Sequence, residues 1–211
     1  MSSVESPGET QPSTRARLID AALTLFRQHG YAATGVKAIL SAAKTPYGSL
    51  YHWFPGGKQE LGVAAVAQGG ARYLALLGAH YPPGVDVVEA TAASFVAAAT
   101  LLEATDYTDA CPIASIALEV ASTDEPMRIA AAAAFESWLE LIAQRLMEAG
   151  MSSAFARETA VEIFCLIEGA ALLSQTARSP EALHIAGRCA TRAVMERLGT
   201  NRETSKIDKT Y

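Results

Sequence analysis

Cysteine is scarce in this 211-residue sequence, and its spacing excludes two kinds of site. Cys111, Cys165 and Cys189 are odd in number and far apart, so they give neither a disulfide framework nor the paired spacing of a zinc site. Long apolar runs and an N-terminal signal pattern are also missing. We therefore expect a cytoplasmic protein with no membrane partner, no metal and no cofactor.

Strand-like alternation of apolar and polar residues is absent, whereas helical spacing recurs along the chain. Between Ser13 and His29 the apolar residues follow an i, i+3, i+4, i+7 pattern, and Gly30 provides a stop. We predict an all-α protein of about nine helices, the last ending at Gly199. The polar residues 1–12 and 200–211 are predicted to be disordered tails.

Capping residues divide the N-terminal part into short helices. Thr34 is expected to cap a second helix, and Thr45 to cap a third, with Pro46 at its first position. Two short helices separated by a tight turn, after a longer helix, are typical of a helix-turn-helix. A fourth helix is expected to begin after Gly57 and to reach about Leu77.

The net formal charge of −5 is unevenly distributed. Residues 13–60 hold six basic and two acidic side chains, whereas residues 61–211 hold 11 basic and 18 acidic ones. A small basic head on a larger acidic body is expected when only the head approaches a polyanion such as DNA.

The segment TPYGSLYHWFPGGKQEL, residues 45–61, combines aromatic and polar side chains in a way that favours DNA contact. Gly48 would let the third helix approach DNA closely, and Lys58 would meet a phosphate at the free N-terminus of the fourth helix. The alternative is that the rings only form core, as we expect for Trp53 and Phe54. The residues predicted to contact DNA are Thr34, Lys37, Thr45, Pro46, Tyr47, Gly48, Ser49, Tyr51, His52 and Lys58.

Residues 14–61 resemble the DNA-binding domain of TetR-family transcriptional repressors. The positions that match the family pattern are Arg15, Ala22, Phe26, Gly30, Tyr31, Thr34, Ile39, Gly48, Ser49, Leu50, Tyr51, Phe54, Lys58 and Leu61. The segments PGGK, Cys111-Pro112, Phe135 to Trp138 and Glu168-Gly-Ala are similar to the LmrA/YxaF-like branch. Gly35 and Tyr47 depart from the pattern, since many members have Ser or Thr at the first position and the branch often has Lys at the second.

This resemblance implies a two-domain repressor. Residues 13–60 would form a three-helix DNA-binding domain, and residues 61–199 a helical domain for ligand binding and dimerisation. The implied partners are a palindromic operator in double-stranded DNA, a second copy of the chain and a small-molecule effector that releases the DNA.

A ligand site in the acidic body should be mostly apolar with a few polar anchors. Glu168 stands out, because a carboxylate within an apolar run needs a partner, a shifted pKa or solvent access. The residues predicted to bind the effector are Tyr73, Leu77, Phe95, Phe135, Trp138, Ile142, Phe164 and Glu168.

The last two helices, near 153–178 and 180–198, are predicted to form a four-helix interface between two copies. The alternative is that both helices pack within their own subunit. The small and apolar residues assigned to the interface are Ile163, Leu166, Ile167, Ala170, Leu173, Ala186, Ala190, Ala193 and Val194.

Two other functional classes remain open. Glu119, Glu140, Glu168, His80 and His184 include the groups an enzyme would use as acid or base, but no Ser-His-Asp order, HExxH motif or phosphate loop occurs. A helical scaffold that binds protein partners through an amphipathic face is the other alternative. The charge distribution and the motif favour a ligand-responsive DNA-binding repressor that is not an enzyme.

Overall fold

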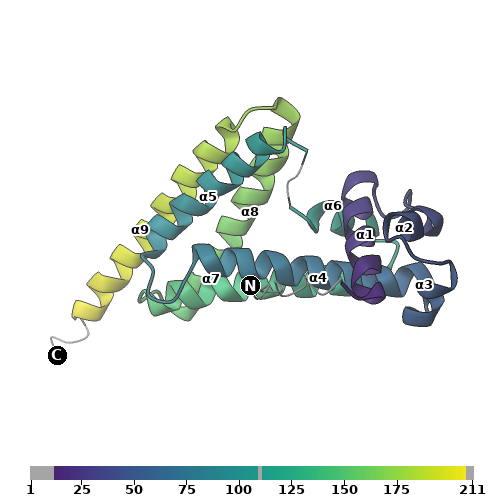
Figure 1. The fold of residues 1–211 in the computed structure, drawn as a ribbon. Coiled ribbons are helices and arrows are strands. Elements are labelled where there is room, and N and C mark those ends of the chain that lie inside the picture. Colours follow the sequence, from purple (N-terminus) through teal and green to yellow (C-terminus); the bar gives the residue numbers. More distant parts are fainter. Residues whose placement is uncertain (1–11, 109–110, 208–211) are drawn as a thin grey trace, which may run out of the picture.

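A computed structural model describes residues 12–108 and 111–207, and the side chains of these residues up to position 199. Within that part every regular element is a helix, as predicted (Figure 1). The elements are α1 (Thr14–His29), α2 (Val36–Ala42), α3 (Gly48–Trp53), α4 (Gly57–His80), α5 (Val87–Ala104), α6 (Ala114–Val120), α7 (Glu125–Glu148), α8 (Ser153–Ala177) and α9 (Glu181–Ile207). Residues 1–11 and 208–211 of the two predicted tails lie outside the described part.

Several helix boundaries are set by local capping, as the sequence indicates. The side chains of Ser13, Asp86, Asp124 and Ser152 each accept a hydrogen bond from a backbone N–H in the first turn of the helix that follows. At the other end of α1, Gly30 takes a positive φ of 85°, which favours glycine. These residues mark where α1, α5, α7 and α8 begin, and the start and end of α1 are as predicted.

The predicted caps of the second and third helices are wrong. The N-cap of α2 is Gly35, because the buried hydroxyl of Thr34 donates instead to the carbonyl oxygen of Gly30 at 2.7 Å. Thr45 does not cap α3, because its buried hydroxyl has no hydrogen-bond partner among the described residues, and its N–H donates to the carbonyl oxygen of Leu40 at 3.0 Å at the end of α2. The third helix begins only at Gly48.

The expected stop at Gly199 is also wrong. Gly199 is not among the glycines with positive φ, and α9 continues through it to Ile207. A glycine ends a helix when the backbone turns left-handed there, and this one keeps the helical course. Most of the segment 200–211 is therefore helical rather than a disordered tail.

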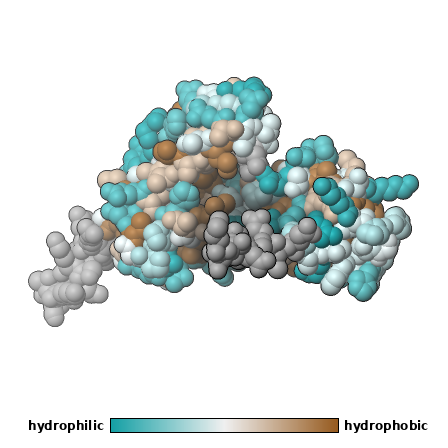
Figure 2. Space-filling model, viewed as in Figure 1, coloured by the Kyte–Doolittle hydropathy of each residue, from teal (hydrophilic) through white to brown (hydrophobic). Residues whose placement is uncertain are grey.

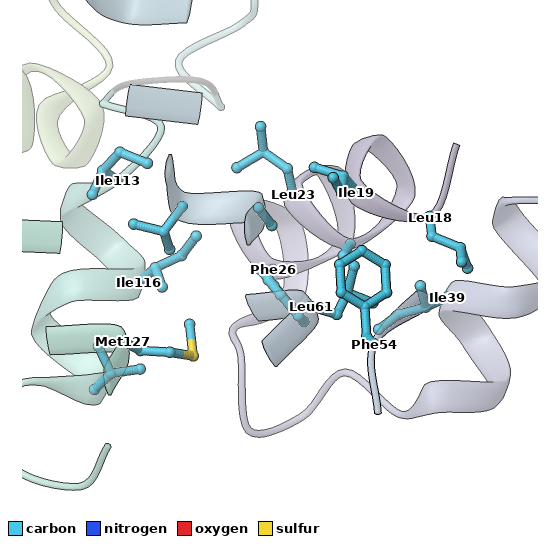
Figure 3. Close-up of a cluster of buried hydrophobic side chains, with 14 of the residues drawn as sticks. Leu18, Ile19, Leu23, Phe26, Ile39, Phe54, Leu61, Ile113, Ile116 and Met127 are labelled. Atoms are coloured by element: carbon cyan, nitrogen blue, oxygen red, sulfur yellow. The ribbon is translucent and has the colours of Figure 1, made fainter. Parts of the chain in front are cut away.

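The first buried cluster joins the N-terminal helices to the body. Figure 3 shows Phe26, Ile39 and Phe54 of the head packed together, with Ile116 of α6 and Met127 of α7 on the body side. Small residues on α4 allow this close packing, since a Cβ on the helical Gly62 would lie 2.7 Å from the sulfur of Met127. The head is therefore anchored on α4, α6 and α7 through one continuous core.

A second buried cluster lies between α5, α7, α8 and α9. The predicted interface residues Ile163, Ala170, Ala186, Ala190 and Val194 are buried within it. The assignment is wrong for these five residues, which pack inside their own subunit as the alternative has it, whereas Leu173 of the same predicted set is 60% exposed. In Figure 1, α5 and α9 run side by side through this region, away from the head.

Helices α4, α5 and α8 are long and apolar enough, by length and composition alone, to cross a membrane. The expectation that no segment of the sequence reaches this length is therefore wrong on these criteria. In the fold, α4 packs on α7, and α5 and α8 pack on α9.

Candidate nucleic-acid interface and adjoining cavity

The turn between α2 and α3 is held by backbone hydrogen bonds and by α1. Lys44 takes a left-handed φ of 52°, and its N–H donates to the carbonyl oxygen of Ser41 at 3.1 Å. Arg17 of α1 donates from Nε to the carbonyl oxygen of Ala43 at 3.2 Å. The orientation of α3 relative to α1 is thus fixed at the turn that precedes it.

Helix α3 has one buried and one exposed side. Leu50 is buried beneath it, whereas Tyr47 and Tyr51 are 60% and 50% exposed, with ring centroids 6.1 Å apart. A Cβ added at Gly48 would meet no atom within 4 Å, so the backbone is open at this point. The exposed side offers two phenol rings and a bare stretch of backbone to a partner.

The structure separates the ten predicted DNA contacts by exposure. Thr34 is buried and its hydroxyl donates to two carbonyl oxygens. The half-buried residues are Thr45, Ser49 and Lys58. The exposed residues are Lys37, Pro46, Tyr47, Gly48, Tyr51 and His52.

Lys58 lies on α4 but points back to the loop between α1 and α2. Its Nζ lies 4.3 Å from the ring centre of Tyr31 and 3.4 Å from the carbonyl oxygen of Ala32. Burial lowers the pKa of Lys58, and the carboxylate of Glu119 partly offsets this. Lys58 is therefore a positive group held against the head rather than a free side chain.

The N-terminus of α4 already holds a carboxylate. The N–H of Gly56 donates to Oε2 of Glu60 at 2.7 Å, an arrangement that satisfies one of the groups left open at a helix start. The expectation that this helix end is free for a phosphate is wrong at Gly56.

The two rings expected in the core differ in their environment. Phe54 is buried, and the guanidinium of Arg15 lies 5.4 Å from its ring centre. Trp53 is 41% exposed and packs edge-on against His52, with ring centroids 5.1 Å apart. Assigning Trp53 to the core is wrong, because Leu50 and Phe54, four positions apart, define the buried side of this helix.

A junction between head and body was not predicted from the sequence. Both carboxylate oxygens of Glu119, on α6, accept hydrogen bonds of 2.6 Å from the N–H groups of Tyr31 and Ala32. Beside it, Gln59 donates to the carboxylate of Asp124 at 3.1 Å. Burial, and next the Asp124 charge, raise the pKa of Tyr31. No local pattern reveals such contacts, since Glu119 and Tyr31 lie 88 positions apart.

A cavity of about 300 Å³ lies between α4, α5, α7 and α8. Six of the eight predicted effector residues line it: Tyr73, Leu77, Trp138, Ile142, Phe164 and Glu168. Phe135 lines an adjoining crevice, and the buried Phe95 lines a separate groove between α5 and α9. Sequence reasoning did not include His80, Tyr81, Ser94 and Cys111, which also line the cavity.

Polar groups gather at one end of the cavity. Burial raises the pKa of Glu168, and a hydrogen bond with the Cys111 thiol partly lowers it. Burial also raises the pKa of Cys111 and of Tyr73, with a further contribution from the Glu168 charge in both cases. The hydroxyl of Tyr81 donates to Thr91 at 3.0 Å. The surroundings at this end of the cavity therefore favour the neutral forms of Glu168, Cys111 and Tyr73.

A larger crevice of about 1170 Å³ separates the head from α8. Its walls come from the end of α1, from α6 and from α8, and it shares Cys111, Phe164 and Glu168 with the cavity. Figure 2 shows apolar side chains on the body in the same view as Figure 1. Glu168 therefore borders both the cavity and the crevice, and a small molecule can reach it from either one.

Comparison with known proteins agrees with this arrangement. A family model of bacterial regulatory proteins of the tetR family matches residues 18–65, and a model of the C-terminal domain of LmrA/YxaF-like transcriptional regulators matches residues 87–189. The HTH-type regulator YxaF of Bacillus subtilis is 34% identical over 163 residues, covering 77% of this chain and 85% of its own. LmrA of the same species is 31% identical over 173 residues, covering 82% and 92%.

A solved structure shows the same fold. The regulatory protein TetR from Rhodobacter sphaeroides superposes with a TM-score of 0.74 at 26% identity, over 85% of this chain and 98% of that one. The chain belongs to the TetR family of bacterial transcriptional regulators, with a C-terminal domain of the LmrA/YxaF-like type.

Proposed function

We propose that this protein is a cytoplasmic repressor that binds a palindromic operator as a homodimer and is released by a small, largely apolar effector. The observation that carries the DNA-binding part is the position of α3, which buries Leu50 and exposes Tyr47 and Gly48. The turn before it is fixed by Arg17, so its exposed side enters a major groove without rearrangement. In this proposal residues 13–60 bind DNA and residues 61–199 bind the effector and the second subunit.

The contacts divide by type. Tyr47, Gly48 and Ser49 lie at the start of α3, where a recognition helix meets base edges. Lys37 is exposed on α2 and supplies a phosphate contact, and Lys58 adds positive charge at short range. The remaining proposed contacts are Thr45, Pro46, Tyr51 and His52. The buried hydroxyl of Thr34 donates to the carbonyl oxygen of Gly30 within the loop, so Thr34 is not among the proposed DNA contacts.

The cavity provides the effector site. Its lining is mostly apolar, with Glu168 and Cys111 at one end, which is the composition of a small-molecule pocket. Cys111 precedes α6, and Glu119 on α6 holds the loop of the head. A ligand that displaces Cys111 from Glu168 would shift α6 and thereby the position of the head. This supplies the differential contact that an allosteric effect requires.

The test of DNA binding uses a duplex selected from a random library with the unmodified protein. Tyr47→Ala is expected to weaken binding to the selected duplex while changing affinity for scrambled DNA little, because base contacts specify sequence. Lys37→Ala is expected to weaken both alike and to reduce the salt slope by about one per subunit. Fluorescence anisotropy at several salt concentrations measures both effects. Equal loss on both duplexes for Tyr47→Ala would refute α3 as the recognition helix.

A further inference from the structure

The wall of the cavity between α4, α7 and α8 contains a cluster of aromatic rings, in which Tyr73 and Phe164 are partly exposed and Trp138 is buried in contact with both. The ring centroids of Tyr73 and Trp138 lie 4.4 Å apart, and those of Trp138 and Phe164 lie 5.8 Å apart. The indole N–H of Trp138 donates to the carbonyl oxygen of Gly70 at 2.9 Å, which fixes the orientation of that ring. The faces of aromatic rings carry partial negative charge, so such a wall attracts a cation.

Glu168 adds a carboxyl group to the same wall. Within residues 12–108 and 111–199 it forms no salt bridge, and its hydrogen bond is with the thiol of Cys111, a weak donor. A partly buried carboxylate that lacks a strong partner is unfavourable, and burial accordingly raises the pKa of Glu168. A positive ligand at this position would supply the missing partner.

Basic side chains lie away from this wall. On the cavity lining the basic residue is His80, which is exposed to solvent. Arg27 and His29 line the outer crevice on the side of the head. The inner cavity therefore presents a carboxyl group and ring faces to its contents, and an anionic ligand would find no complementary charge on that wall.

We propose that the cavity selects a small lipophilic cation, such as an aryl quaternary ammonium ion, whose charge lies between Glu168 and the partly exposed rings of Tyr73 and Phe164. This inference rests on the proposed function of the cavity as the effector site and specifies the charge of the effector. The apolar part of the ligand packs against Leu77 and Ile142, which line the same cavity. Binding replaces the weak Cys111 contact of Glu168 with an ion pair.

The test compares two probes of equal shape, benzyltrimethylammonium and its neutral carbon isostere neopentylbenzene. Titrations monitored by tryptophan fluorescence give the dissociation constant of each probe for the full-length protein. The cation is expected to bind at least about tenfold more tightly than the isostere, because ring faces and a carboxylate act on it together in a desolvated site. Glu168→Gln is expected to remove most of this preference while the isostere binds as before. Retained binding of the isostere also shows that the variant cavity is intact.

Glu158→Gln is the matched control, because Glu158 is an exposed carboxylate on the same helix. It should keep the preference for the cation. A cation that binds no better than the isostere, or a preference that survives Glu168→Gln, overturns the inference. If only the isostere binds, and it releases the selected duplex, the cavity is still the effector site and only the proposed preference for a cation is refuted. If neither probe binds, the inference about charge is overturned, whereas DNA binding is judged by the duplex experiment.

Discussion

At Gly48, one substitution is expected to weaken DNA binding without lowering the stability of the fold. A Cβ at Gly48 would meet nothing in the protein, so Gly48→Ala should not disturb the fold. Alanine in the first turn of α3 should even stabilise the head by up to about 0.5–1 kcal/mol. If the backbone lies against DNA, however, the added methyl group must hold it away. We therefore expect duplex affinity to fall at least about tenfold, a loss of about 1.4 kcal/mol, while the thermal midpoint stays level or rises.

Gly78→Ala provides the control for this prediction. Gly78 lies in α4, and a Cβ there would likewise meet no atom within 4 Å. The substitution should change helix stability in the same direction without changing DNA affinity. Wild-type affinity in Gly48→Ala, measured on the same selected duplex, would place the DNA elsewhere on the head.

At the scale of elements, α6 is one of the connections between the body and the head, beside the core that the head shares with α4 and α7. Glu119 accepts two hydrogen bonds of 2.6 Å from the loop after α1, and a Cβ at the neighbouring Gly30 would lie only 3.0 Å from its Oε2. Glu119→Ala removes both acceptors. Amide exchange at Tyr31 and Ala32 is expected to accelerate at least about tenfold, because a hydrogen bond to a charged group contributes a net of about 1.5–3 kcal/mol.

Hydrogen-exchange mass spectrometry of the loop peptide measures this change. Glu125→Ala is the control, since Glu125 is an exposed carboxylate that pairs with Arg128 three residues along α7. It should leave exchange in the loop unchanged. Unaltered protection in Glu119→Ala would mean that the hydrophobic core, and not α6, holds the loop.

The ends of the helices could be predicted from the sequence only where the contacts that set them are local. Caps that act on the next turn, such as Ser13, Asp86 and Ser152, join a donor and an acceptor that are close in sequence, so a local pattern can reveal them. Thr34 and Thr45 were misassigned, because nearby carbonyl oxygens of the previous turn compete for their polar groups or backbone. Contacts that join distant positions, such as Glu119 with the head, leave no trace in local spacing.

The candidate sites follow the same division. Most of the residues predicted to form the cavity do line it, because aromatic and acidic side chains within long helices are easily recognised. Phe95 faces another groove, since its side of α5 depends on how α9 packs. For the third helix, residue type correctly indicated that Tyr47 is exposed, but it did not indicate the exposure of Trp53. The environment of Trp53 depends on which side of this short helix carries Leu50.

For the whole molecule, the burial of the predicted interface residues moves the expected dimer contact to the other side of α8 and α9. Val161, Cys165 and Leu172 are exposed along one side of α8, four and seven positions apart, and Gly169 between them leaves room for close approach. On α9, Met195 is also exposed. Exposed apolar side chains in such a row favour a self-complementary contact with a second copy.

We expect the protein to sediment as a dimer at micromolar concentration and Leu172→Glu to sediment as a monomer, because a charge at a two-fold contact meets its own copy and loses its water. Ile129→Glu is the matched control: Ile129 is 53% exposed on α7, compared with 62% for Leu172, and lies outside the proposed contact. It should remain dimeric. The monomeric variant should also lose the selected duplex, since one head alone reads only half of a palindrome. If the wild-type protein sediments as a monomer, or Leu172→Glu as a dimer, the two-half-site arrangement is contradicted. If Leu172→Glu is a monomer with unchanged affinity for the duplex, one head is sufficient for binding.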